Sequence, residues 1–66
     1  MNITEYDDNE GDIIFLIGSE RRKEILDKLR ANKIVARCDN SDTSFCKIIA
    51  ACSIEQLNQA LEDLPD

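Results

Sequence analysis

The sequence predicts an α+β fold in which two helices cover one face of an antiparallel or mixed β-sheet. Three short runs rich in Ile, Val or Phe alternate with two helical stripes, and turn-forming residues separate them. No internal repeat, linker or low-complexity segment interrupts this alternation. We therefore expect residues 1–66 to form a single domain with the element order (β)βαββα.

The run DIIFLI, residues 12–17, predicts a strand because it is short, rich in Ile and Phe, and bounded by glycines. Successive side chains of a strand point to opposite faces of its sheet. One face of this strand carries Ile13, Phe15 and Ile17, and the other carries Ile14 and Leu16. Both faces are apolar, which is typical of a strand that is covered on both sides.

A helix is expected over residues 20–31. Ser19 is a suitable N-cap, Glu20 favours the positive end of the helix, and Asn32 can close it in the left-handed conformation. The predicted buried stripe consists of Ile25, Leu26 and Leu29, with Arg22 at its edge.

A hairpin is expected next, with strands over residues 33–38 and 44–52 and the turn-forming sequence DNSDT between them. The favoured register places Ile34, Ala36 and Cys38 on the same face as Cys46, Ile48 and Ala50. The opposite face then carries Val35, Arg37, Phe45, Lys47 and Ile49. This second face mixes apolar and basic groups.

The second helix begins at a predicted capping box formed by Ser53 and Gln56. Its apolar stripe consists of Ile54, Leu57, Ala60, Leu61 and Leu64. At the other end of the chain, residues 1–11 are expected to supply an N-terminal strand over residues 2–6 and an acidic, turn-rich loop.

Assembly of these elements gives a split βαβ sheet. The crossover rule makes the strand at residues 12–17 parallel to that at 33–38, with the strand at 44–52 antiparallel between them. This order resembles the ferredoxin-like architecture without its last strand. An N-terminal strand on the outer edge of residues 12–17 would give a circularly permuted version, and the resemblance concerns topology alone.

Size and charge limit the classes of partner. A chain of 66 residues forms a marginal core, so a protein partner is a reasonable expectation. The net charge of −6 disfavours nucleic acid and anionic membranes. No apolar run approaches the length of a transmembrane helix, and no basic leader precedes one, so we expect a cytoplasmic protein.

Metal binding and catalysis find little support in the residue types. The chain has three cysteines and no histidine, and the cysteines lack the close C-x-x-C pairs of a zinc site. We therefore expect no metal, no cofactor and no enzymatic activity. Cys38 and Cys46 could form a redox pair across the hairpin, but reduced cysteines packed in the core are the favoured interpretation.

A second candidate site is the turn between the first strand and the first helix. Backbone N–H groups at a helix N-terminus can bind an anion, and nearby cations would strengthen the attraction. The residues concerned are Gly18, Ser19, Arg21, Arg22 and Lys23. The alternative is a simple join with a capping serine and solvated cations, because no nucleotide-binding motif is present.

The uncovered sheet face is the preferred functional surface, because four or five apolar side chains there would otherwise remain in water. The candidate interface residues are Val35, Arg37, Phe45, Lys47 and Ile49. We expect a protein-interaction module that acts as a homodimer or as a regulatory, accessory or inhibitory subunit. A small-ligand sensor binding an anion at residues 18–23 is the alternative, and weak nucleic-acid binding, suggested by Phe45 between basic residues, is a third.

Overall fold

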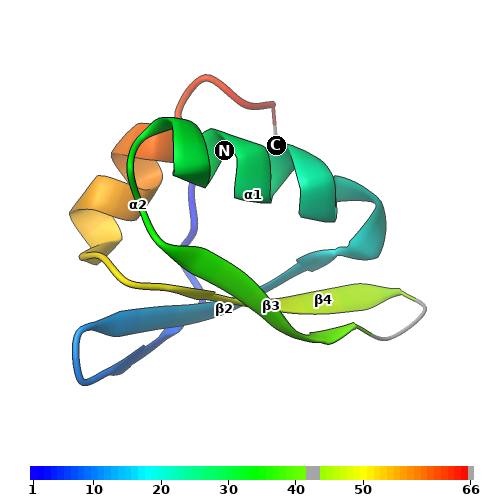
Figure 1. Cartoon of the computed structure of the whole chain (residues 1–66), viewed down its shortest axis with the longest axis horizontal. Helices are drawn as coiled ribbons and strands as arrows, with labels where there is room; N and C mark the ends of the chain where they lie inside the picture. Colours follow the sequence, from blue (N-terminus) through cyan, green and yellow to red (C-terminus); the bar gives the residue numbers. More distant parts are fainter. Residues whose placement is uncertain (42–43, 66) are drawn as a thin grey trace.

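The computed structural model describes residues 1–41 and 44–65 and has the expected α+β architecture (Figure 1). Two helices lie in one layer above a four-stranded sheet, and the other face of the sheet carries no helix. The elements are β1 (Asp7–Asn9), β2 (Asp12–Gly18), a 3-10 turn (Ser19–Arg21), α1 (Arg22–Ala31), β3 (Ala36–Ser41), β4 (Phe45–Ala50) and α2 (Ile54–Leu61).

The strand order β1-β2-β4-β3 confirms the split βαβ topology. Strand β4 pairs antiparallel with both β2 and β3, so β2 and β3 run parallel to each other on either side of it. Strand β1 lies antiparallel on the outer edge of β2, which is the position required for a permuted ferredoxin-like sheet. The likeness to that architecture rests on this strand order alone.

The core lies between the sheet and the helices, and the predicted hairpin register is confirmed. Ala36 pairs with Ala50 and Cys38 pairs with Ile48, so the small and apolar side chains of both strands point toward the helices. The buried residues include Ile13, Phe15 and Ile17 of β2, Ile25 and Leu29 of α1, Cys46, Ile48 and Ala50 of β4, and Leu57, Ala60 and Leu61 of α2. Leu26, Ile34, Ile54 and Leu64 pack at the margin of this cluster.

The predicted start of α2 is confirmed. The Gln56 backbone N–H donates to the Ser53 hydroxyl oxygen at 3.1 Å, and the Ser53 backbone N–H donates to the Gln56 side-chain oxygen at 3.1 Å. These reciprocal bonds satisfy two of the four free N–H groups at the helix N-terminus.

Both ends of α1 differ from the prediction. The chain passes through a 3-10 turn first, so the N-cap position of α1 falls on Arg21 rather than Ser19, and Arg21 makes no side-chain cap bond. At the other end Lys33, not Asn32, takes the left-handed conformation, with φ of 62°. The Lys33 N–H bonds to the Arg30 carbonyl and the Ile34 N–H bonds to the Leu29 carbonyl, which is a Schellman motif.

The cap at the end of α1 also makes the hairpin begin later in the chain than the sequence predicts. Lys33 and Ile34 complete the cap, so β3 begins at Ala36 instead of residue 33. Strand β3 then continues to Ser41 through an irregularity between Cys38 and Asn40, and residues predicted as turn therefore belong to the strand. The remaining turn prediction, at residues 42–43, lies outside the described residues.

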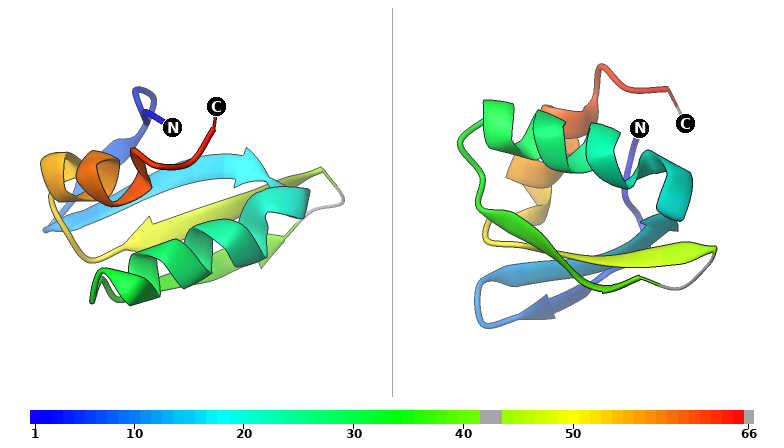
Figure 2. Two further views of the ribbon diagram at one scale, coloured as in Figure 1. Left: turned by 90° about the horizontal axis from the view of Figure 1, so that it is seen from above. Right: turned by 45° about the vertical axis from the view of Figure 1, so that its right-hand side comes forward.

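The N-terminal strand exists but not at residues 2–6. Strand β1 is Asp7–Asn9, and Glu10 and Gly11 connect it to β2 with φ values of 52° and 88°. Positive φ at both central positions is the requirement of the tight hairpin turn. Residues before β1 cross to the helix layer instead, where Ile3 is held by α2 (Figure 2).

Residues 2–6 form no strand because the Asn58 side chain bonds to the Ile3 backbone in place of a neighbouring strand. The Ile3 N–H donates to Asn58 Oδ1 at 2.6 Å, and Asn58 Nδ2 donates to the Ile3 carbonyl at 3.2 Å. The Met1 ammonium group donates to the backbone carbonyls of Leu61 and Leu64. Backbone groups that a sheet edge would have paired are thereby satisfied at α2.

We predict that Asn58→Ala lowers the free energy of unfolding by about 1–2 kcal/mol, because Ile3 loses a donor and an acceptor at a partly buried position. Urea unfolding followed by circular dichroism measures the change. Gln59→Ala is the matched control, since Gln59 is an exposed neighbour on the same helix, and it should change stability by less than about 0.5 kcal/mol. Equal effects of the two substitutions would contradict the prediction.

Candidate functional site

The face of the sheet turned away from the helices is the principal candidate surface, and we call it the open face (Figures 1 and 2). Strand alternation and pairing place Arg37, Phe45, Lys47 and Ile49 of the predicted interface on it, and Val35, one residue before β3, lines a hollow with Arg37 and Ile49. The open face consists of Ile14 and Leu16 of β2, Val35 and Arg37 at β3, and Phe45, Lys47 and Ile49 of β4.

Large apolar side chains on this face are in contact with water. Val35 is 78% exposed, Leu16 is 66% exposed and Phe45 is 57% exposed. Ile14 and Ile49, at the centre of the sheet, are half-buried by their neighbours. Tyr6, 40% exposed, lies beside the β1 edge of the same face. The exposed large apolar side chains of the described chain are thus concentrated on one side of the molecule.

Backbone pairing arranges these side chains in rows across the strands. Asp7 pairs with Ile14, Ile14 pairs with Ile49, and Ile49 pairs with Arg37. In the next row Leu16 pairs with Lys47, and beyond it Gly18 pairs with Phe45. The rows fix which side chains lie next to one another, because paired residues of adjacent strands share a face.

The acidic and basic groups of the open face belong to different strands but lie near one another, since Lys47 lines one hollow with Asp7 and Arg37 lines another with Asp12. The acidic groups Asp7 and Asp12 belong to the β1–β2 side, and the basic groups Arg37 and Lys47 belong to β3 and β4. Within residues 1–41 and 44–65, none of these four side chains forms an ion pair or side-chain hydrogen bond. They are therefore available to a partner.

A shallow hollow of about 640 Å³ borders the open face at its β1 edge. Its lining combines the exposed Leu16 and Tyr6 with the Lys47 side chain and two acids, Glu5 and Asp7. A smaller hollow of about 70 Å³ lies at the opposite side, between Val35, Arg37 and Ile49. Both are concave extensions of the same apolar surface rather than separate sites.

The turn proposed for anion binding has other contacts. The Ser19 N–H donates to the Ser44 carbonyl at 3.0 Å, and Arg21 Nη2 bonds to Glu24 at 2.9 Å and to the Pro65 carbonyl at 2.6 Å. A Cβ on Gly18 would lie 2.7 Å from the Glu20 carboxylate, so a negative charge already occupies this position. Arg22 and Lys23 are exposed. The anion site remains a sequence prediction, and these contacts do not favour it.

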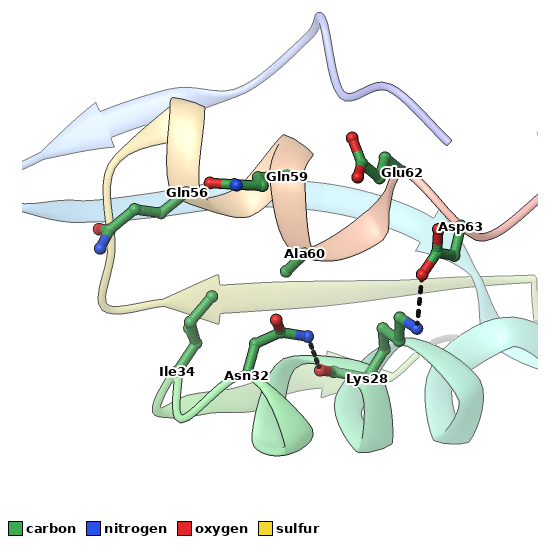
Figure 3. A pocket seen from close by; sticks show the side chains of 8 residues that line it. All are labelled: Lys28, Asn32, Ile34, Gln56, Gln59, Ala60, Glu62 and Asp63. Carbon is green, nitrogen blue, oxygen red and sulfur yellow. Dashed lines mark hydrogen bonds and ion pairs between the residues drawn. The ribbon is translucent and has the colours of Figure 1, made fainter.

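A polar groove of about 350 Å³ separates the two helices (Figure 3). The Lys28 ammonium lies 3.3 Å from the Asp63 carboxylate across it, and Asn32 Nδ2 donates to the Lys28 carbonyl at 2.9 Å. Its remaining lining is formed by Ile34, Gln56, Gln59, Ala60 and Glu62. The exposed ion pair contributes little stability, and its two charges are already paired with each other.

The cysteines are both packed and paired. Cys46 is fully buried and Cys38 packs against the core, as the sequence favoured, but the two are also joined as a disulfide with Cα atoms 6.4 Å apart. This spacing lies within the ordinary range for a disulfide. Cys52 is buried and free, and burial raises the pKa of its thiol. The expectation of three reduced cysteines is therefore wrong for two of them.

Residues 1–41 and 44–65 contain neither a cluster of metal ligands nor a membrane-spanning helix. No group of three or more His, Cys, Asp or Glu side chains lies in an arrangement that could hold a metal ion. No helix there is long and apolar enough to span a membrane. Comparison of the chain with protein-family models, curated proteins and solved structures gave no match.

Sequence reasoning overlooked part of the open face. Ile14 and Leu16 were assigned to the second face of their strand, but they were not included among the interface residues. The sequence places Asp7 in an acidic loop, because it predicts the N-terminal strand at residues 2–6 rather than at Asp7–Asn9. The hairpin turn signal at Glu10-Gly11, between Asn9 and Asp12, was the feature that would have placed Asp7 beside Ile14.

We predict that the unfolded, unreduced protein reacts with iodoacetamide at one cysteine and that the reduced protein reacts at three, as counted by mass spectrometry. Closing a loop across eight residues should also stabilise the fold by about 2–3 kcal/mol, measured by urea unfolding with and without reductant. Three labelled cysteines without reductant would contradict the pairing. The Cys52→Ala variant keeps the Cys38–Cys46 pair, so it should react with iodoacetamide at no cysteine without reductant and at two cysteines with reductant.

The raised pKa of Cys52 gives a separate prediction. Folding favours the protonated thiol, so its contribution to stability is complete below the ordinary thiol pKa of 9.0 and decreases as pH rises above it. Urea unfolding from about pH 7.5 to about pH 10.5 should show a steeper loss of stability in wild type than in Cys52→Ala. The difference should stay below about 1.4 kcal/mol per pH unit. Identical slopes of stability against pH in wild type and Cys52→Ala would contradict this prediction.

Proposed function

We propose that this chain is a non-enzymatic protein-interaction module that binds another protein through the open face. The observation that carries the proposal is the concentration of Leu16, Val35 and Phe45 on the face without helices, each more than half exposed. Transfer of such side chains from water to an interface contributes about 25 cal/mol per Å² of apolar surface. The partner is a second copy of the chain or a protein for which this module is a regulatory, accessory or inhibitory subunit.

The charge pattern supports a protein partner over nucleic acid. The open face carries two cations, Arg37 and Lys47, but also two carboxylates, Asp7 and Asp12. A nucleic-acid surface would present cations to successive phosphates without acids beside them. Neither this pattern nor the net charge of −6 favours the weak nucleic-acid binding considered from the sequence.

The cytoplasmic location predicted from the sequence remains a prediction within this proposal. The pairing of Cys38 with Cys46 weighs against it, because disulfides are uncommon in proteins kept in a reducing compartment. The open face and its residues are the same in either compartment, since the disulfide lies on the helix side of the sheet.

Affinity capture with matched variants tests the proposal. The immobilised wild-type chain should retain a specific protein from extract of its native cells, a second copy of itself included. Leu16→Glu/Phe45→Glu should lose that protein by at least about tenfold, because two charges enter the apolar surface. Ala31→Glu/Gln59→Glu adds the same charge at exposed helix positions and should retain it.

Circular dichroism should show that all three proteins are folded, since the substituted side chains are exposed. Equal retention by wild type and Leu16→Glu/Phe45→Glu would contradict the proposal. Absence of any retained protein, together with a monomeric wild type, would contradict it as well.

A further inference from the structure

We infer that the occupant of the open face is a second copy of this chain, packed face to face about a two-fold axis that runs parallel to β2 and β4. The inference rests on the proposed function, because it names the partner of the same surface. Its basis is the order in which acidic, apolar and basic residues follow one another across the sheet.

One row of the sheet crosses all four strands and reads acid, apolar, apolar, cation. It runs from Asp7 on β1 through Ile14 on β2 and Ile49 on β4 to Arg37 on β3. The midpoint of the row lies between β2 and β4, which are the two central strands. A two-fold axis through this midpoint and parallel to the strands reverses the strand order but keeps each row at its own height.

In that arrangement the row of one copy lies against the same row of the second copy, with the strands in the opposite order. Ile14 of one copy faces Ile49 of the second copy, and Asp7 faces Arg37 of the second copy, with each contact made twice. Aligned sheets pack about 10 Å apart, a separation that the long Arg37 side chain can bridge. An axis perpendicular to the strands would instead bring the β1 edges together, with Asp7 against Asp7. Charge therefore selects one of the two face-to-face orientations.

The neighbouring rows are also compatible with a two-fold axis parallel to β2 and β4. Leu16 of one copy faces Lys47 of the second copy, whose aliphatic stem can cover it while the ammonium reaches the rim. In the next row Phe45 faces Gly18, which has no side chain to obstruct the ring. The carboxylate of Glu20 lies close to Gly18, but Glu20 is an exposed, flexible side chain that can turn aside.

The charge balance of the open face favours self-association even though each copy carries a net charge of −6. Asp7, Asp12, Arg37 and Lys47 lie on this face, and none of these four has an ion-pair partner within residues 1–41 and 44–65. The Glu20 carboxylate adds a further negative charge beside Gly18. The net negative charge of each copy opposes association. Its long-range repulsion is screened beyond about 8 Å at about 0.15 M salt.

The size of the open face sets the expected affinity. Three strands about 20 Å long and the three-residue β1, about 10 Å long, span roughly 340 Å² at a spacing of about 4.8 Å. A standard interface buries roughly 800 Å² of accessible surface on each partner, which is close to one-fifth of the 4484 Å² of this chain. The flat area of the open face is below this standard, so we expect a weak, reversible dimer with a dissociation constant no tighter than the micromolar range.

Charge reversal tests both the partner and the orientation. Asp7→Arg places two cations opposite each other at both ends of the dimer, and Arg37→Asp places two acids there. Each variant alone should weaken self-association by at least about tenfold in sedimentation equilibrium from about 10 µM to about 1 mM protein. An equimolar mixture should form a heterodimer, because every Asp7→Arg chain then meets an Arg37→Asp chain with both pairs restored.

The double variant Asp7→Arg/Arg37→Asp should dimerise like wild type. At protein concentrations where wild type is monomeric, both single variants should unfold at the wild-type temperature because both positions are exposed. The inference is overturned by a wild type that stays monomeric to about 1 mM, by single variants that dimerise like wild type, or by a mixture that stays monomeric. If pure wild type is monomeric but a different protein is retained through Leu16 and Phe45, the proposed function stands and the second copy is excluded.

Discussion

The pairing of β2 with β4 is the constraint on which the rest of the structure depends. Strand β4 lies between two parallel strands, so its register with β2 also fixes the position of β3. Phe15 pairs with Ile48 and Ile17 pairs with Cys46, which sends the most apolar side chains of both strands toward α1 and α2. A shift by one residue would turn these side chains away from the helices and bring Lys47 toward the core in place of a buried apolar residue.

The same register creates the open face. Two short helices can cover one side of a four-stranded sheet, and every residue that alternates with a core residue must then point to the other side. Leu16 and Phe45 are exposed because their neighbours Phe15 and Cys46 are buried. The distribution of charge follows from strand order as well, since the acids belong to the first hairpin and Arg37 to the opposite edge. Core and candidate interface are thus two consequences of one pairing.

Local patterns predicted well wherever a few adjacent residues decide the structure. The Ser53–Gln56 capping box was predicted because both of its hydrogen bonds join residues three apart. The hairpin register was predicted because alternation and cross-strand matching leave one arrangement with apolar groups inside. The predicted end of α1 failed because Asn32 and Lys33 can both adopt the local geometry, and the choice depends on Ile34 reaching the core beside Leu29.

Alternation in the sequence by itself determined the α+β class, the split βαβ order and the mixed character of the open face. Tertiary structure alone decided the place of the N-terminal strand, because Asn58, 55 residues from Ile3, binds the backbone that the sequence assigned to that strand. It also decided that Cys38 and Cys46 are joined, and that Asp7 shares a row with Arg37 three strands away. Contacts between residues so distant along the chain leave no periodic signal, since periodicity reports which face a residue occupies and not which residue lies opposite it.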